Sequence, residues 1–292
     1  MSTVAFIGVG TMGAPMARNV RRGHAVRAYD VNRAAVEALA DAGIMGAETA
    51  ADAARGADLV ITMLPNASHV EEAAFGPDGF AAAMDPGALY IDMSTIAPTA
   101  TDAIGRRMGE RGIAMIDAPV GRQVQHAVAG TLLIMVGGQE SDLVRARPVL
   151  ELMGDTIVHC GPLGSGSRMK IVNNYMSIAL NVLSAEALVL AERSGVAPEL
   201  AREVMLGTAA GQGHFGTTYP AKVLKGDVTP GFMIDLAHKD LGLALELAAE
   251  LNVPAATGAV ARLAYQLARR HGRGRQDWSA IYMLLRELAG LA

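Results

Sequence analysis

The stretch Phe6-Ile7-Gly8-Val9-Gly10-Thr11-Met12-Gly13 decides the fold of this chain. It places a Gly-x-Gly-x-x-Gly turn directly after an apolar segment that begins near residue 3. Such a turn lets the backbone approach a pyrophosphate closely, and the helix that follows offers its N-terminal N–H groups to the negative charge. We expect Gly8, Gly10 and Gly13, with Thr11 and Met12 between them, to bind a dinucleotide. The alternative is an ordinary tight strand-to-helix turn.

A carboxylate at the expected distance from this turn favours the dinucleotide. The next apolar segment, residues 25–29, ends at Asp30, which can accept hydrogen bonds from the adenosine ribose hydroxyls. A negative charge there repels a 2′-phosphate, so the sequence favours NAD, as NADH, over NADP. Asn32 and Arg33 weaken this preference, because an arginine just past the strand can hold a phosphate.

Short apolar segments alternate with helix-patterned ones over the first part of the chain, which indicates an α/β fold with a mostly parallel sheet and helices on both faces. We therefore expect a Rossmann-type N-terminal domain over residues 1–162. Ligands of such sheets bind beyond the carboxyl ends of the strands, where Leu64, Pro65 and Thr95 stand. The strand candidates are residues 4–7, 25–29, 59–63, 88–91, 114–116 and 132–136.

After residue 162 the strand pattern stops and long helical segments follow, which predicts an all-α C-terminal domain over residues 163–292, joined to the first domain by a long helix. These segments are about residues 166–194, 197–207, 236–251, 254–271 and 277–289.

Composition excludes several classes of function. The chain has 292 residues, enough for two domains, and a net charge of −4 without a basic stripe, so we expect no nucleic-acid partner. A single cysteine and the absence of a secretory signal at residue 1 favour the cytoplasm. Residues 175–190 are too often interrupted by polar side chains for a membrane span and are expected to form a core helix. No cluster of His, Cys, Asp and Glu has metal-ligand spacing, so no metal is expected.

A polar arc on the first long helix is the candidate for the chemistry. Lys170, Asn174, Ser177 and Asn181 fall at i, i+4, i+7 and i+11, among apolar neighbours. A lysine there can donate a hydrogen bond to a carbonyl oxygen, stabilise the developing alkoxide and supply its proton, while Asn174 orients lysine or substrate. The alternative is a lysine that reaches solvent and asparagines that fix helix packing.

Several segments together resemble the β-hydroxyacid dehydrogenase family, whose members include 3-hydroxyisobutyrate dehydrogenase. The likeness spans nearly the whole chain, with the motifs in order: residues 8–17, Asp117-Ala118-Pro119-Val120, Gly130-Thr131-Leu132, Lys170-Ile171-Val172-Asn173-Asn174 and His238-Lys239-Asp240-Leu241.

This resemblance implies a catalytic lysine at Lys170 and a helical domain that forms a homodimer or homotetramer. It also implies that Asn173 and Asn174 serve catalysis or substrate binding, and it suggests a carbonyl substrate rather than an imine. The cofactor-lining positions that it implies are Thr11, Met12, Leu64, Thr95 and Lys239.

One loop departs from the family pattern. Most members follow Asp-Ala-Pro-Val with Ser-Gly-Gly, whereas this chain has Gly121, Arg122 and Gln123. A guanidinium suits a larger oxyanion such as a sulfonate, because its N–H pairs engage two oxygens together. We expect Gly121 and Arg122, with Thr95, Asn173, Asn174 and Ser177, to bind the substrate. The alternative for Arg122 is a surface or cofactor-phosphate contact.

These features predict an NADH-dependent reductase of a small anionic aldehyde, with Lys170 as proton donor and Arg122 as sulfonate anchor. The loop variant and several C-terminal segments resemble a branch of the family that reduces a short sulfonated aldehyde. A dehydrogenase of 3-hydroxyisobutyrate or another short hydroxyacid is the alternative of the same class. A non-catalytic dinucleotide-binding assembly protein is the alternative of a different class, and Lys170 argues against it.

Overall fold

The computed structural model describes residues 1–291. The chain divides into two compact units, Met1–Tyr175 and Met176–Ala292. The sequence suggested a division at 162/163, where the strand pattern ends. The boundary between the compact units lies inside the long helix α8 (Ser165–Arg193), whose first turns pack with the sheet, and the division at 162/163 stays a prediction.

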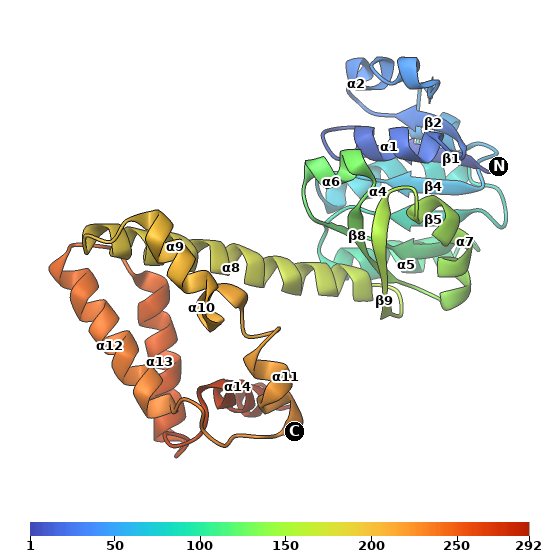
Figure 1. Cartoon of the computed structure of the whole chain (residues 1–292). Coiled ribbons are helices and arrows are strands. Elements are labelled where there is room, and N and C mark those ends of the chain that lie inside the picture. The colour runs from blue at the N-terminus through green and yellow to red at the C-terminus, as the bar shows by residue number, and fades with distance from the viewer. Residues whose placement is uncertain (292) are drawn as a thin grey trace. The chain divides into compact units, whose positions relative to one another are not determined.

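In the part of the chain that the structure describes, nine strands form one sheet in the order β3-β2-β1-β4-β5-β6-β8-β7, with β9 paired to β8 (Figure 1). The strands β1 to β6 run parallel, β8 is antiparallel to β6 and β7, and β9 is parallel to β8. Their bounds are β1 Thr3–Ile7, β2 Ala25–Tyr29, β3 Met45–Gly46, β4 Leu59–Thr62, β5 Leu89–Asp92, β6 Ala114–Asp117, β7 Val120–Gly121, β8 Leu132–Gly137 and β9 Gly154–Gly161.

Two apolar cores lie on opposite faces of the sheet because successive side chains of a strand alternate. On β1, Val4 and Phe6 belong to the core that includes residues of α1 and α7, and Ala5 and Ile7 belong to the core that includes residues of α3, α4 and α5. The helices of this unit are α1 Gly13–Arg21, α2 Arg33–Glu37, α3 Ala50–Ala54, α4 Ala67–Phe75, α5 Pro98–Gly109, α6 Val124–Ala129 and α7 Glu140–Leu150, with 3-10 turns η1 Ala40–Ala42 and η2 Phe80–Ala82. The α/β fold and all six predicted strands are confirmed.

Up to residue 291 the regular elements of the second unit are all helical, as predicted, and its well-buried core is small, formed by Ile234, Ala268, Ala280 and Leu284. The short helices α10 and α11 were not predicted, because four residues are too few to show a helical period. The elements are the distal part of α8, α9 Pro198–Leu206, α10 Ala209–Gln212, α11 Thr218–Ala221, η3 Val223–Lys225, α12 Ile234–Glu250, α13 Ala256–Arg270, η4 Trp278–Ala280 and α14 Ile281–Leu288.

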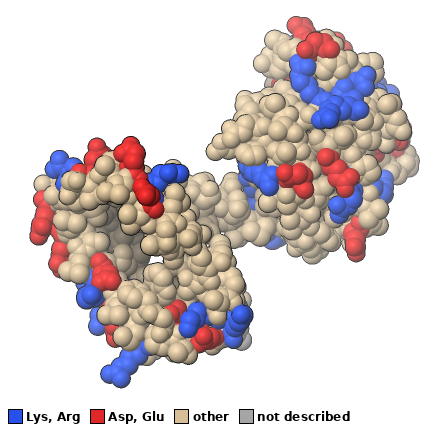
Figure 2. Space-filling view, in the orientation of Figure 1, with Lys and Arg blue, Asp and Glu red and all other residues tan. Residues whose placement is uncertain are grey.

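The helix α8 is exposed in the single chain. Only Gly166 and Ser167 of its 29 residues are buried, so the expectation of a core helix over residues 175–190 is wrong for this chain taken alone. By length and composition α8 is the one described helix that could cross a membrane, and none of its most apolar 18-residue window is buried. Its apolar side chains therefore lack a cover within the described chain. Figure 2 shows charges of both signs interspersed on the visible face of each unit.

Candidate active site

The carboxyl ends of five strands lie level with one another. The register pairs Ile7 with Tyr29 and with Thr62, Thr62 with Asp92, and Asp92 with Asp117. The loops that follow these residues therefore begin along one edge of the sheet, where parallel α/β sheets bind their ligands. The glycine turn, Asp30, Leu64, Pro65 and Thr95 all lie in these loops.

The three glycines of the turn have distinct steric roles. Gly8 has φ 90°, and a Cβ there would lie 2.4 Å from the carbonyl oxygen of Met63. A Cβ on Gly13 would lie 1.9 Å from the carbonyl oxygen of Gly8, so α1 packs against the strand end without room for a side chain. Gly10 is exposed, and a Cβ there would meet no described atom within 4 Å. A tight turn, close helix packing and an open approach to the backbone are the three requirements of a pyrophosphate site.

The N-terminus of α1 is free to face an anion. Among the described residues no side chain caps this terminus at Met12, and the first turn contains no acidic residue. Arg18 and Arg21 lie in the last turn, where they complement the negative end of the helix dipole. Thr11 is exposed and Met12 half-buried beside this terminus. The turn therefore fits the diphosphate of a dinucleotide.

Asp30 links the glycine turn to the end of β2. One carboxylate oxygen accepts a hydrogen bond from the backbone N–H of Val9 at 2.8 Å, and the other accepts from the N–H of Asn32 at 2.9 Å. A carboxylate has acceptor sites for about four donors. Asp30 is thus fixed beside the turn and keeps acceptor sites for ribose hydroxyls.

A buried hydrogen-bond chain fixes the loops after β4 and β5. Thr62 Oγ1 and the N–H of Ser94 donate to one carboxylate oxygen of Asp92, at 2.9 and 3.0 Å. Ser94 Oγ accepts in turn from the N–H of Leu64 at 2.9 Å. Burial raises the pKa of Asp92 to about 6. These linked hydrogen bonds hold the backbone at Leu64 and Ser94. They therefore set the positions of the half-buried Leu64 and of the exposed Pro65 and Thr95.

Leu64 also lies next to the glycine turn, since a Cβ on Gly8 would come within 2.7 Å of Leu64 Cδ2. The structure thus brings together Gly8, Gly13, Asp30 and Leu64, four of the cofactor residues predicted from the sequence.

Asp117 anchors the start of α8 to the sheet. Its carboxylate accepts hydrogen bonds from the N–H of Gly164 at 2.7 Å and from the N–H of Ser167 at 2.6 Å. Burial raises the pKa of this carboxyl group, and those hydrogen bonds oppose the rise. The first turn of α8 is therefore held at the end of β6, and Lys170 follows about one turn later.

Lys170 is half-buried, and burial lowers the pKa of its ammonium below the ordinary value of 10.5. Among residues 1–291 it forms no ion pair with a carboxylate. Asn174, one turn on, is also half-buried, whereas Asn173 and Ser177 are exposed. Asn173 Nδ2 donates to Asn174 Oδ1 at 3.4 Å. Lys170, Asn173 and Asn174 belong to the first compact unit, and Ser177 belongs to the second.

Arg122 lies at the end of β7, away from these groups in the hydrogen-bond network. Its Nη1 donates to Asp155 Oδ1 at 2.7 Å and to the carbonyl oxygen of Thr131, and its Nη2 donates weakly to Thr156 Oγ1 at 3.4 Å. Among the described residues, no hydrogen bond or ion pair joins Arg122 to Lys170 or Asn174. The preceding Gly121 is buried in β7, paired with Leu133.

Lys239, predicted to line the cofactor, is exposed on α12 in the second unit. Its ammonium pairs with the carboxylate of the adjacent Asp240 at 2.9 Å. Its role toward a cofactor stays a prediction.

Comparison with known proteins agrees with this geometry. The model of the NAD-binding domain of 6-phosphogluconate dehydrogenase matches residues 3–161, and the model described as NAD-binding of NADP-dependent 3-hydroxyisobutyrate dehydrogenase matches residues 164–285. The chain belongs to the 3-hydroxyisobutyrate dehydrogenase family. This confirms the resemblance found in the sequence and makes the protein an NAD(P)-binding oxidoreductase that acts on a hydroxyl or aldehyde group.

Three members of the family illustrate its range. The chain is 50% identical to 3-sulfolactaldehyde reductase of Escherichia coli K12, over 100% of this chain and 98% of the relative. It is 39% identical to the NAD-dependent L-serine dehydrogenase of Pseudomonas aeruginosa, over 97% and 98%. A solved structure of 3-hydroxyisobutyrate dehydrogenase from Mycobacterium tuberculosis with L-serine superposes with a TM-score of 0.69 at 38% identity, covering 98% of this chain and 99% of that one.

Sequence reasoning did not assign a role to three acidic residues of the site. Asp92 and Asp117 directly follow the predicted strands 88–91 and 114–116, so their position next to the ligand edge was a usable signal. Glu48, which lines a hollow beside Asp30, follows a two-residue strand with no apolar alternation. Its sequence context therefore gave no signal.

Proposed function

We propose that the protein reduces 3-sulfolactaldehyde to 2,3-dihydroxypropane-1-sulfonate, with NADH as the hydride donor. Residues 1–162 bind the dinucleotide, and residues 163–292 hold substrate and oligomerise. The observation that supports this substrate most directly is Arg122, which replaces a small residue of the family's anion loop, in a chain 50% identical over its full length to 3-sulfolactaldehyde reductase.

Lys170 is the proton donor of this proposal. Reduction of an aldehyde places negative charge on the carbonyl oxygen, and an ammonium without a carboxylate partner is available to stabilise that charge and to release its proton. The lowered pKa of Lys170 eases the release. Asn174 and Asn173 orient the ammonium and the substrate hydroxyl.

Arg122 is the sulfonate anchor of this proposal. Its guanidinium has five N–H donors, of which Thr131, Asp155 and Thr156 take three, so within residues 1–291 Nε and one N–H of Nη2 remain. These two donors lie on one edge of the planar group, suited to two oxygens of one anion. The bond to Asp155 holds that edge in place. Thr95, Asn173 and Ser177 are further donors for the substrate.

We infer NAD rather than NADP as the nucleotide, because Asp30 places a negative charge where a 2′-phosphate would lie. The family does not settle this choice, since one matched model is described for an NADP-dependent enzyme and one relative is named NAD-dependent.

We also infer a cytoplasmic homodimer or homotetramer in which the exposed apolar side of α8 meets a second copy of the chain. Tyr175, Ile178, Val182 and Val189 fall on one side of the helix, at about 100° per residue, and are between 45% and 77% exposed. This stripe needs an apolar cover.

The test is a comparison of kcat/KM with NADH for 3-sulfolactaldehyde and for the semialdehydes of methylmalonate, tartronate and succinate. We expect a preference for the sulfonate of about 100-fold or more, because its third oxygen can accept from the further donors of the site while the other two face Arg122. A preference for a carboxylate would identify a 3-hydroxyisobutyrate-type dehydrogenase instead. NADH binding without turnover of any aldehyde would point to the non-catalytic alternative.

A further inference from the structure

We propose that Glu48 is a selectivity residue for the nucleotide, because it holds Arg33 in an ion pair and so keeps the guanidinium from a 2′-phosphate. This inference rests on the proposed use of NAD and names the side chain that enforces it. The ion pair would also explain how the chain prefers NAD although Arg33 stands where an arginine can hold a phosphate.

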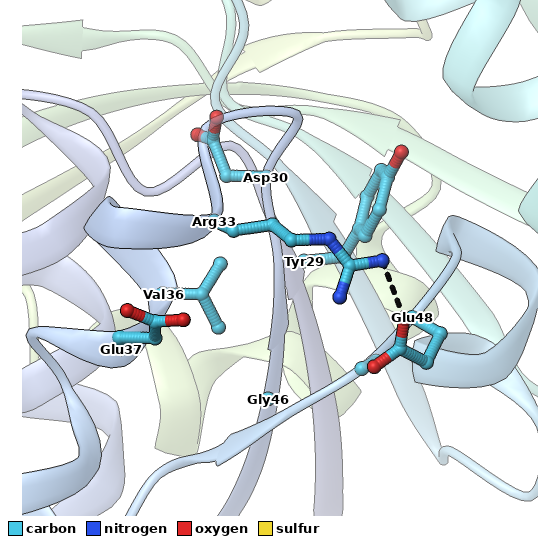
Figure 3. Close-up of a pocket in the computed structure, with 8 residues that line it drawn as sticks. Tyr29, Asp30, Arg33, Val36, Glu37, Gly46 and Glu48 are labelled. Atoms are coloured by element: carbon cyan, nitrogen blue, oxygen red, sulfur yellow. Dashed lines mark hydrogen bonds and ion pairs between the residues drawn. The ribbon is translucent and has the colours of Figure 1, made fainter.

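The ion pair lies in a hollow next to the glycine turn. The hollow has a volume of about 160 Å³ and opens at the end of β2, beside Asp30 (Figure 3). Because Asp30 accepts a hydrogen bond from the N–H of Val9 in the turn, the hollow is placed to receive the adenosine end of a dinucleotide. Its lining residues are Tyr29, Asp30, Arg33, Val36, Glu37, Gly46, Ala47 and Glu48.

The charges of this hollow oppose a phosphate. It contains the carboxylates of Asp30, Glu37 and Glu48 and one guanidinium, that of Arg33. A 2′-phosphate would add up to two negative charges to a site that is already net negative. The 2′-hydroxyl of NAD carries no charge and can donate to Asp30.

Arg33 is committed to one partner across the hollow. Arg33 Nη2 donates to Glu48 Oε2, which lies 15 residues further along the chain between β3 and α3, and Figure 3 shows the guanidinium turned toward Glu48 rather than toward Asp30. The hydrogen bond to Glu48 raises the pKa of Arg33, and the same bond lowers the pKa of Glu48, so both groups stay charged around neutral pH.

The pair is exposed, which makes it easy to change without damage to the fold. The two side chains are 67% and 72% exposed, and ion pairs of this kind contribute little to stability. The effect of Glu48 is therefore on the choice of ligand. Without it, Arg33 becomes free to bind a phosphate.

The experiment measures the Kd of NAD⁺ and NADP⁺ by calorimetry on the full chain, without substrate, for the wild type and for Glu48→Gln, Arg33→Gln and the double variant. Glu140→Gln is the matched control, since Glu140 is exposed on α7 outside the hollow. We expect Glu48→Gln to tighten NADP⁺ binding by about tenfold or more and to change NAD⁺ binding by less than about twofold. The double variant should lose this gain in NADP⁺ affinity.

An unchanged NADP⁺ Kd in Glu48→Gln would overturn the inference, and so would a gain that persists in the double variant, because the effect would then not pass through Arg33. If the wild type binds NAD⁺ in either case, the proposed cofactor stands and only the role of Glu48 is rejected. A wild type that binds NADP⁺ more tightly than NAD⁺ would reject both.

Discussion

Lys170 has a half-buried ammonium and no carboxylate partner among the described residues. A lysine with a purely structural role does not need this arrangement. Lys170→Met keeps the apolar stem and removes the proton. We expect kcat for reduction to fall by about 10²- to 10⁴-fold, the usual contribution of a general acid, with the Kd of NADH unchanged. Lys225→Met, at an exposed position, is the control. Unchanged turnover in Lys170→Met would exclude the acid role.

The lowered pKa of Lys170 also predicts a pH profile. A general acid must be protonated, so the rate of reduction falls as pH rises through the pKa of Lys170, which lies below 10.5. Lys170→Arg keeps a charge that does not titrate in this range, so its residual activity should lack that alkaline decline. The measurement is kcat against pH at saturating substrate, and an identical decline in both proteins would contradict the assignment.

Arg122 occupies a backbone conformation that suits glycine. Its φ is 73°, a region in which an L-residue with a side chain is strained by about 1–2 kcal/mol. The family pattern has glycine at this position. Strain of this kind at a ligand site is retained when the side chain has a function.

Arg122→Gly should therefore raise KM for the sulfonated aldehyde by about 100-fold while changing the free energy of unfolding by less than about 1 kcal/mol, since relief of strain offsets the lost ion pair. Arg122→Lys keeps the charge without the planar edge, so its KM should lie between those of the wild type and Arg122→Gly. Steady-state kinetics and urea unfolding give the two quantities. A KM that does not change would return Arg122 to a surface role.

At the scale of elements, the ends of β5 and β6 hold buried carboxylates that organise the loops around the site. The folded pKa of Asp92, about 6, lies above its ordinary value of 3.8. Its stabilising contribution is therefore complete below pH 3.8 and is lost as pH rises through 6, a change of about 3 kcal/mol.

Asp92→Asn keeps an acceptor for Thr62 and Ser94 but does not titrate. We expect the unfolding free energy of this variant to gain about 2.5 kcal/mol relative to the wild type between pH 4 and 7, measured by urea unfolding at several pH values. Asp85 is exposed, and the control variant Asp85→Asn should show the same pH dependence of the unfolding free energy as the wild type. Parallel curves for Asp92→Asn and the wild type would show that burial does not shift this group.

The sequence predicted the elements whose signal is local. Six strands showed apolar runs, and the glycines at 8, 10 and 13 showed the turn. It missed β9, where Asp155, Thr156 and His159 interrupt the apolar pattern, and it missed β3 and β7, which have two residues each. Asp92 is hydrogen-bonded to Thr62, about 30 positions away along the chain. Asp117 is hydrogen-bonded to the start of α8, about 50 positions away. No local pattern encodes such pairings, nor that of Arg33 with Glu48.

For the whole molecule, the exposed apolar side of α8 predicts association. Val182→Glu places a charge in the middle of the stripe, and burying an unpaired charge in an interface costs several kcal/mol. We expect this variant to shift from oligomer to monomer in light scattering after size exclusion. Gln139→Glu, exposed on the first unit, should leave the mass unchanged. A wild type that is monomeric at all concentrations would contradict the proposed interface.

The unit boundary after Tyr175 has a consequence for recombination between relatives. Lys170, Asn173 and Asn174 belong to the same compact unit as the sheet, although they stand on the first turns of the helix that continues into the other unit. A chimaera joined at 175/176 would inherit Lys170, the proposed proton donor, together with the parent strand whose Asp117 anchors the start of α8. One joined at 162/163 would pair a foreign lysine with that anchor. The first junction keeps Arg122, Asp117 and Lys170 from one parent, so the proposed sulfonate contact and the proposed proton donor would pass to the chimaera together.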